Sequence, residues 1–455
     1  METVRGFTKK QRGILQLPII LLLLYLVFSL ILYEFGPIDW KTPDPMKFWL
    51  FQAACLLALL FGYQLGLHTK EPKNHQINTE QIIKIFKILL IANFFYIFLN
   101  LFRTFGFASF DFPGLGKALW EGLQNPGAGY TNVLAANDLE GYQVVGGYLG
   151  TIYNLLWYFV AFPILVFGAI LFTRLKWNWR LLIGITYGLI VLQYFAMGTN
   201  IGIFRIILII TLMVVLYSLR KSFSDASGLT QKQKTAIILL VALAALGVLL
   251  FFVKTMKGRG GILYWESETY NIGGVGLDRD SVFFKILPEG LYITLISVTR
   301  YLTCGYYGLA LCMEVPWVPM FGFGSSMNVV DMLTSNHIFD LQSMTYQYRA
   351  MQAFGWDDRI MWHSMYSWFA NDFSFFGVIL IMFGIGFLFA MVYKDCLFTD
   401  NPFAKVLFVY FVLMFFFIPC NNQIIQSFYT LFSFVLMLVC WFVSRWTKAF
   451  GGVKL

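Results

Sequence analysis

Long apolar runs separated by short polar connections dominate this chain. Ten runs come close to the roughly 20 residues that cross about 30 Å of hydrocarbon. They lie at residues 17–36, 48–67, 83–102, 150–172, 180–197, 201–219, 235–253, 366–393, 403–419 and 424–444. The pattern predicts an all-α polytopic membrane protein with about ten transmembrane helices.

The polar connections set the expected orientation. The connections RLKWNWR, LRKSFSDASGLTQKQK and YKDCLFTDNPFAK and the C-terminal tail are basic, whereas residues 108–147 are acidic and rich in glycine. Because basic loops stay in the cytoplasm, both termini are expected there. We interpret the first run as a retained helix rather than a cleaved signal peptide, because Leu17–Tyr33 is long enough to span and no A-x-A-like site follows it.

Three segments follow from this topology. Residues 1–253 form seven spans with an external loop at 103–149, residues 254–363 form a large external loop, and residues 364–455 form three spans and a tail. FDFPGLGKALWEGLQNPGAGY in the first loop indicates a turn and a short amphipathic helix. Leu291–Cys312 resembles an eleventh span, but it would put the termini on opposite sides and bury Arg300 in lipid. We expect it to be an interfacial or re-entrant helix.

Composition supports a membrane protein and excludes several function classes. The chain is 58% hydrophobic and 13% charged, with a formal charge of +9. Since most Lys and Arg residues lie in short connections, the charge sets orientation and does not indicate nucleic-acid binding. The six cysteines are scattered without metal-ligand spacing, so we predict no metal site, no disulfide framework and no cofactor.

Cations near the predicted outer surface are candidates for binding a phosphate group. Arg205 follows GTN near the outer end of its span and either snorkels to the interface or lines an anion site. Lys257 and Arg259 lie in KTMKGRGG, either a phosphate cradle or a mobile basic loop beside lipid headgroups. Arg300 and Arg349 belong to the large loop.

Two residues near the eighth span are candidates for proton transfer. His363 precedes it, and Asp372 lies inside it, where a carboxylate is either functional or a buried partner of Arg205 or Arg300. Nine residues separate the two side chains, so they are not expected to be in contact unless the helix starts after His363. The glycan-binding candidates are aromatic or amide side chains that serve equally well as membrane anchors or caps: Tyr306, Trp362, Tyr366, Asn421, Asn422 and Gln423.

Several of these phrases together resemble a known family. GTN with the following Arg205, SVTRYLTCGYYGLALCMEVPW, WHSMYSWFANDFSFFGVILIMFGIGF and PCNNQIIQS resemble O-antigen polymerases of the Wzy type, which are related to O-antigen ligases. The resemblance covers the architecture of the whole chain. It is most specific from Thr299 to Ser427.

The resemblance implies a glycosyltransferase of the bacterial inner membrane. Such an enzyme joins oligosaccharide units carried on undecaprenyl diphosphate, at the outer face and without a nucleotide sugar. Arg205, Arg300 and Arg349 would stabilise the departing diphosphate. His363 or Asp372 would accept the proton of the attacking hydroxyl, and a single displacement would invert the anomeric centre.

Other functions remain compatible with the sequence. A lipid-linked glycan flippase also needs cations and a polar cavity, but it would carry charges through several spans and show an internal repeat. An O-antigen ligase differs in its acceptor, and a passive scaffold would tolerate substitution of the external Arg and His residues. The expected partners are the lipid-linked oligosaccharide, membrane lipid, a chain-length regulator and a flippase.

Overall fold

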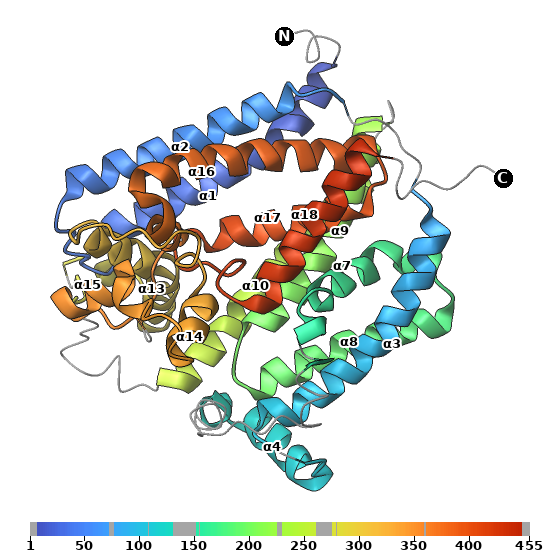
Figure 1. Ribbon diagram of the computed structural model, residues 1–455, viewed down its shortest axis with the longest axis horizontal. Helices are drawn as coiled ribbons and strands as arrows, with labels where there is room; N and C mark the ends of the chain where they lie inside the picture. The colour runs from blue at the N-terminus through green and yellow to red at the C-terminus, as the bar shows by residue number, and fades with distance from the viewer. Residues whose placement is uncertain are drawn as a thin grey trace. The chain divides into compact units, whose positions relative to one another are not determined.

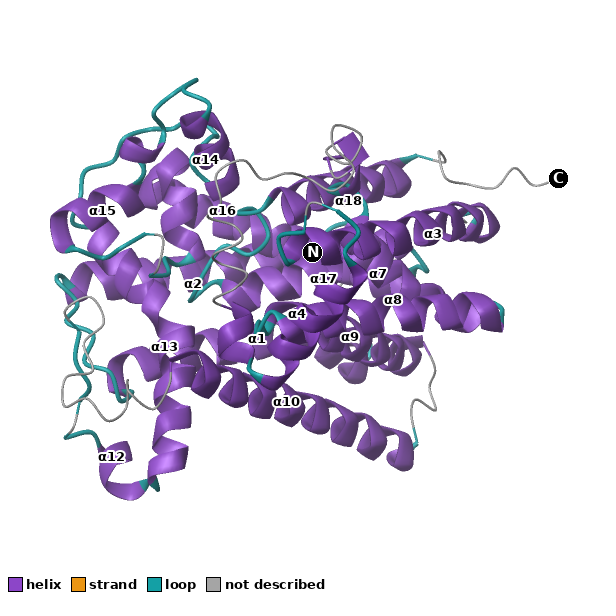
Figure 2. Cartoon of the chain, turned by 90° about the horizontal axis from the view of Figure 1, so that it is seen from below, coloured by secondary structure: helices purple, strands orange, loops and turns teal. Residues whose placement is uncertain are grey.

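The computed structural model consists of helices and connecting segments (Figure 1). It describes residues 7–71, 77–107, 109–130, 152–153, 155–224, 230–260, 275–278, 280–358 and 361–447. Within these ranges every regular element is a helix (Figure 2). A single antiparallel bridge between Ile38 and Leu277 is the extended pairing found there.

Eight helices of the described residues are long and apolar enough to cross a membrane, judged by length and composition. They are α1 (Lys9–Phe35), α2 (Pro45–Leu67), α3 (Thr79–Thr104), α8 (Trp177–Ala196), α9 (Ile201–Ser224), α10 (Gln231–Gly260), α16 (Met365–Phe398) and α18 (Phe428–Trp446). Two shorter apolar helices are α7 (Ala161–Leu171), continued by η1 (Phe172–Arg174), and α17 (Pro402–Phe417). The all-α polytopic membrane fold is confirmed.

The helix at the fourth predicted run is shorter than expected. The run at 150–172 contains α7, which begins only at Ala161 because Val160 has non-helical backbone angles and Tyr158–Val160 form a turn. Trp157 precedes this turn and donates a hydrogen bond from Nε1 to Oδ1 of the buried Asn93 at 2.9 Å. Residues 155–157 before this turn are helical, so the turn interrupts the predicted span.

The remaining elements are short or lie in the predicted external loops. They are α4 (Phe112–Gln124), α12 (Val282–Ile286), α13 (Glu289–Cys312), α14 (Met327–Ser335), η2 (Gln342–Met344) and α15 (Tyr346–Phe354). α4 confirms the short helix predicted in the first loop, and Asp111 caps it by accepting a hydrogen bond from the N–H of Gly114 at 2.9 Å. α13 confirms a helix at Leu291–Cys312 and is not among the eight candidate spans.

The chain divides into two compact units that draw on separated segments. Unit 1 comprises Met1–Pro72, Ser267–Phe398 and Tyr410–Leu431, and unit 2 comprises Lys73–Glu266, Thr399–Val409 and Phe432–Leu455. The three consecutive segments expected from the sequence describe the order of spans along the chain. The compact units instead follow packing between helices that are distant in sequence.

In unit 1, α2 and α16 run side by side (Figure 1) and pack at backbone contact. A Cβ at Gly62 would lie 1.9 Å from the carbonyl oxygen of Phe383, and a Cβ at Gly386 would lie 2.3 Å from that of Leu59. Glycine is therefore required at both positions. Close packing through small residues is the usual means of joining helices in lipid, where the hydrophobic effect adds little.

In unit 2, α8 packs against α3, α4 and α9, and α9 also packs against α7 and α10. Gly122 of α4 allows a similar close approach, because a Cβ there would lie 2.0 Å from the carbonyl oxygen of Ala196. The amphipathic α4 is thus held on the end of a candidate span.

A break divides α16 within its span. Ser374 has φ 57° and ψ 169°, so residues 365–373 and 375–398 are two helical pieces. A positive φ is uncommon for a residue other than glycine and costs of order 1–3 kcal/mol. The break places Asn371 and Asp372 at the end of the first piece, where the polar network described below begins.

Candidate functional site

The segment Trp362–Ser364 lies directly against one face of α13. The N–H of Ser364 donates to the carbonyl oxygen of Gly305 at 2.9 Å. A Cβ at Gly308 would lie 2.7 Å from the carbonyl oxygen of Trp362 and 2.8 Å from Nδ1 of His363. Gly308 therefore allows this segment to approach the helix backbone.

Arg300 lies on α13 beside an aromatic pair. The rings of Tyr301 and Trp362 meet edge to face at 4.6 Å, and the thiol of Cys304, one turn after Arg300, hydrogen-bonds to the backbone of Trp362. Arg300, Tyr301 and Trp362 are all half-buried. We call these three residues the Arg300 patch.

No hydrogen bond or ion pair holds the Arg300 guanidinium among the described residues. A cation that is half-removed from water without a counter-charge is costly, and an anionic ligand offsets that cost. The patch therefore combines a cation that has no hydrogen-bond or ion-pair partner in the described ranges with aromatic rings that suit a sugar face.

His363 is fully buried beside α13. Its Nδ1 lies 3.5 Å from Sγ of Cys312, and its Nε2 has no hydrogen-bond partner in the described part of the chain. Burial lowers the pKa of His363 to about 3, although a hydrogen bond with the backbone of Gly308 partly raises it. The imidazole is thus neutral at pH 7, with one ring nitrogen unoccupied.

Asp372 is held by backbone donors. Its carboxylate accepts hydrogen bonds from the N–H groups of Gly322, Gly324 and Ser325 at 2.8, 2.9 and 2.8 Å, and from the Ser325 hydroxyl. Asp372 makes no ion pair with Arg300 within the described residues, and its oxygens accept these four hydrogen bonds instead. A pairing of Asp372 with Arg205 stays a prediction. No bond joins Asp372 to His363, and α16 starts after His363, at Met365.

A buried amide network continues from Asp372. Asn371 donates from Nδ2 to the carbonyl oxygen of Gly324 and to Oε1 of Gln347, both at 2.9 Å, and accepts from the N–H of Tyr346 at 2.8 Å. Asn422 donates from Nδ2 to the carbonyl oxygen of Ser325 at 3.2 Å. The loop preceding α14 is therefore fixed from two sides.

Protein groups contact most of the Arg349 guanidinium. It donates from Nε to the carbonyl oxygen of Thr345 at 3.2 Å, donates from Nη1 to that of Pro316, and lies over the ring of Tyr346 at 5.1 Å. Burial lowers the pKa of Arg349, and the neighbouring Tyr346 and Cys312 oppose that shift. Its buried Nη2 has no partner among the described residues.

Arg300 and Arg349 lie near different parts of α13. Arg300 interacts with Cys304 and Arg349 with Cys312. Eight residues of helix separate the two cysteines, which corresponds to about 12 Å along the axis. These contacts place Arg300 beside the middle of α13 and Arg349 beside its C-terminal end.

The other predicted phosphate ligands belong to unit 2. Arg205 is half-buried, and its guanidinium lies 6.0 Å from the centre of the Phe162 ring. Lys257 and Arg259 lie in the last turns of α10, which continues to Gly260. Gly258 and Gly260 are helical, so their amides do not form the predicted flexible cradle. Gly261 and the side chains of Lys257 and Arg259 lie outside the described residues. Grouping Arg205 with Arg300 stays a prediction.

Four of the predicted glycan-binding residues are structural. Tyr306 and Tyr366 are each 1% exposed, and Asn421 and Asn422 are buried, so none of the four presents a surface to a sugar. The Tyr306 hydroxyl instead shares a hydrogen bond with Ser29 at 3.0 Å. Tyr306 of α13 packs on α1 and α2, and Tyr366 of α16 packs on α2; apolar periodicity does not distinguish such packing from an interface.

Trp362 and Gln423 are the predicted glycan-binding residues that stay partly exposed. Trp362 belongs to the Arg300 patch, and its carbonyl oxygen accepts from Nε1 of Trp356 at 3.3 Å. Gln423 is half-buried, and its carbonyl oxygen accepts from the Thr430 hydroxyl at 3.0 Å.

The sequence interpretation missed Asp39. Its neighbour Trp40 donates from Nε1 to the Thr303 hydroxyl at 3.0 Å and packs on Tyr307 at 5.4 Å, which fixes this segment on α13. The carboxylate of Asp39 is exposed, without a side-chain bond among the described residues. In the sequence, Asp39 could have been noticed as an acidic residue in PIDW, between the first two spans.

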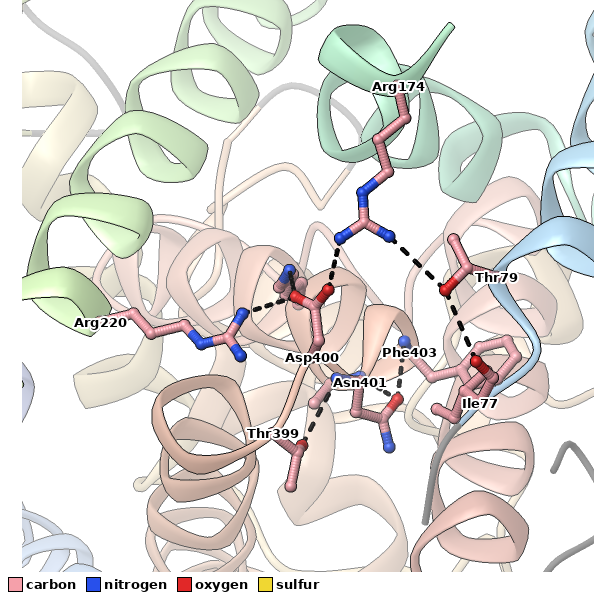
Figure 3. A network of polar contacts seen from close by, with 10 residues as sticks. Ile77, Thr79, Arg174, Arg220, Thr399, Asp400, Asn401 and Phe403 are labelled. Carbon is pink, nitrogen blue, oxygen red and sulfur yellow. Dashed lines mark hydrogen bonds and ion pairs between the residues drawn. The ribbon is translucent and has the colours of Figure 1, made fainter. Parts of the chain in front are cut away.

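A second missed feature lies in unit 2. Arg174, Arg220 and Lys405 all bind Asp400 (Figure 3). In the sequence, Asp400 stands out as an acidic residue within a basic connection, but the sequence does not show which cations surround it.

No group of three or more His, Cys, Asp or Glu side chains within the described ranges is arranged to hold a metal ion. No protein-family model, curated protein or solved structure matches the chain, so its function has to be inferred from the residues described above.

Proposed function

We propose that this protein is a membrane glycosyltransferase that polymerises oligosaccharide units carried on undecaprenyl diphosphate into a surface polysaccharide. Arg300 carries the proposal: a half-buried guanidinium without an acidic partner in the described chain, next to the Tyr301–Trp362 ring pair. The cation suits a phosphate group and the rings suit a sugar, and the proposed substrate contains both.

The proposed reaction is a single displacement. The acceptor hydroxyl oxygen bonds to the anomeric carbon of the growing glycan as the bond from that carbon to the diphosphate oxygen breaks. The electron pair leaves with the diphosphate, where Arg300 stabilises the added negative charge. The anomeric centre is inverted, and no metal or nucleotide sugar takes part.

The acceptor proton needs a base with a vacant lone pair. Asp372 is the weaker of the two original candidates, because four donors already occupy its carboxylate. His363 keeps an unpartnered Nε2 among the described residues, but that nitrogen is buried and its lowered pKa makes it a weak base. Asp39 fits the role better because its carboxylate is exposed beside α13, so we assign the role to Asp39.

The proposed setting is the bacterial inner membrane, with both termini in the cytoplasm and the large loop outside. A flippase and a chain-length regulator would act with the enzyme, the first supplying lipid-linked units and the second limiting polymer length. A flippase function for this chain itself is less well supported, because Arg300 lies on a helix that is not among the eight candidate spans. An O-antigen ligase would use the same donor chemistry with a different acceptor.

Substitution of Arg300 by Gln tests the proposal in a strain that lacks the chromosomal copy of the gene. We expect the surface-glycan ladder to disappear while single-unit product and the amount of membrane-inserted protein are unchanged, because Arg300 has no hydrogen-bond partner in the described part of the chain whose loss would destabilise the fold. Lys285→Gln is the matched control, since Lys285 is an exposed cation of the same loop. A ladder of normal length from Arg300→Gln would refute the role of Arg300, and loss of single-unit product would indicate a flippase.

A further inference from the structure

A cluster of three cations around one carboxylate joins four segments of unit 2 (Figure 3). Arg174 of η1 donates from Nη2 to Asp400 at 2.7 Å, and Arg220 of α9 donates from Nη1 at 2.6 Å. Lys405 of α17 donates from Nζ at 2.6 Å. Arg174 also reaches the Thr79 hydroxyl at the start of α3, at 3.5 Å. We call Arg174, Arg220, Lys405 and Asp400 the Asp400 cluster.

The Asp400 cluster carries an excess of positive charge. Burial alone would raise the pKa of Asp400, but Lys405, Arg220 and Arg174 outweigh it and lower the pKa to about 2. The carboxylate is therefore ionised at neutral pH. One negative charge among three cations gives the cluster a net charge of +2, which no other carboxylate among the described residues pairs with.

The two arginines keep donors for a second anion. A guanidinium has five N–H groups, and Arg220 makes one hydrogen bond in the described structure, to Asp400. The side chains of Arg174 and Arg220 are 48% and 34% exposed, so their remaining N–H groups are accessible. A phosphate diester has the two oxygens that such a pair of cations binds well.

Residues next to Arg174 are of the kind found where a membrane meets water. Trp177, at the start of α8, is 75% exposed, and Phe172 of η1 is also exposed. Lys87 lies over the Trp179 ring at 5.3 Å. Exposed Trp residues beside cations at the ends of apolar helices are typical of the headgroup region. The basic connections that contain the cluster are expected on the cytoplasmic side, whose leaflet is rich in anionic lipid.

We propose that the Asp400 cluster binds the phosphate of an anionic phospholipid headgroup. The lipid would neutralise the excess charge and bridge η1 and α9, while Asp400 compensates one of the three cations. This site is independent of the glycan chemistry proposed for unit 1.

Retention of lipid by the purified full-length protein tests this proposal. Protein in nanodiscs that contain equal amounts of phosphatidylglycerol and phosphatidylcholine would be extracted into mild detergent, and bound lipid would be counted by native mass spectrometry. We expect retained phosphatidylglycerol in the wild type and about fivefold weaker retention in Arg220→Gln, since one cation near an anionic surface contributes about that factor. Lys117→Gln, which removes an exposed cation of α4 in unit 2, should retain the wild-type amount.

Asp400→Asn distinguishes a lipid site from a purely internal ion cluster. Removing the internal carboxylate leaves three cations for the ligand, so phosphatidylglycerol retention should be maintained or increased. Equal retention by wild type and Arg220→Gln, or loss of retention in Asp400→Asn with the fold intact by circular dichroism, would overturn the proposal. Displacement of the lipid by millimolar inorganic phosphate would also overturn it, by identifying a site for a soluble anion.

Discussion

Ser325 donates two hydrogen bonds to Asp372, one from its backbone N–H at 2.8 Å and one from its hydroxyl. With the N–H groups of Gly322 and Gly324, they tie the loop before α14 to the end of the first piece of α16. The loop backbone has positive φ values of 50° at Phe321 and 97° at Gly322. Asp372 therefore stabilises a backbone conformation that the loop would not adopt by itself.

Asp372→Asn should destabilise the protein by about 3 kcal/mol, because the amide places a donor against the donors of Ser325. Thermal unfolding in detergent, followed by tryptophan fluorescence, would show a lower midpoint. Asp280→Asn removes an exposed carboxylate of unit 1 and should leave the midpoint unchanged. If Asp372→Asn is as stable as wild type but inactive, Asp372 has a chemical role rather than this structural one.

The sequence identified Asp372 as unusual but gave no indication of its partners. A carboxylate inside an apolar run is visible in the residue pattern, whereas its donors lie 47 to 50 residues earlier and are glycine and serine amides. The positions of the apolar helices, by contrast, depend on local composition and were predicted well. The contact of Tyr306 was equally hidden in the sequence, because its hydrogen-bond partner Ser29 is 277 residues away.

Gly308→Ala should displace the segment that carries His363. Its Cβ would lie 2.7 Å from the carbonyl oxygen of Trp362 and 2.8 and 3.0 Å from the buried rings of His363 and Trp356. We expect a cost of about 1–3 kcal/mol for overpacking, measured as a lower thermal midpoint. Gly384→Ala in α16 is the control, because a Cβ there meets nothing within 4 Å. Equal midpoints for the two variants would contradict the close approach of this segment to α13.

Tyr306→Phe distinguishes a core residue from a glycan ligand. The substitution removes the hydroxyl that shares a hydrogen bond with Ser29, so stability should fall by about 1 kcal/mol. Glycan chain length on a gel should be unchanged, because the ring is buried between other aromatic residues. If Tyr306→Phe of normal abundance produced shortened glycan chains, Tyr306 would be a substrate-binding residue instead.

The stability of the protein should depend on pH through His363. Burial lowers the pKa of His363 to about 3 in the folded protein, against an ordinary value of 6.5. Between these values the unfolded state binds a proton that the folded state does not, so stability is present above pH 6.5 and is lost as the pH falls toward 3. From pH 7 to pH 5 the expected loss is about 2 kcal/mol. Unfolding midpoints at the two pH values would measure it.

His363→Gln should remove this part of the pH dependence, since glutamine is neutral at both pH values. The exposed His337 provides the control, because His337→Gln leaves the buried imidazole in place and should keep the wild-type difference between pH 7 and pH 5. A wild-type pH dependence in His363→Gln would mean that another group titrates. It would also mean that His363 is more accessible than its contact with Cys312 indicates.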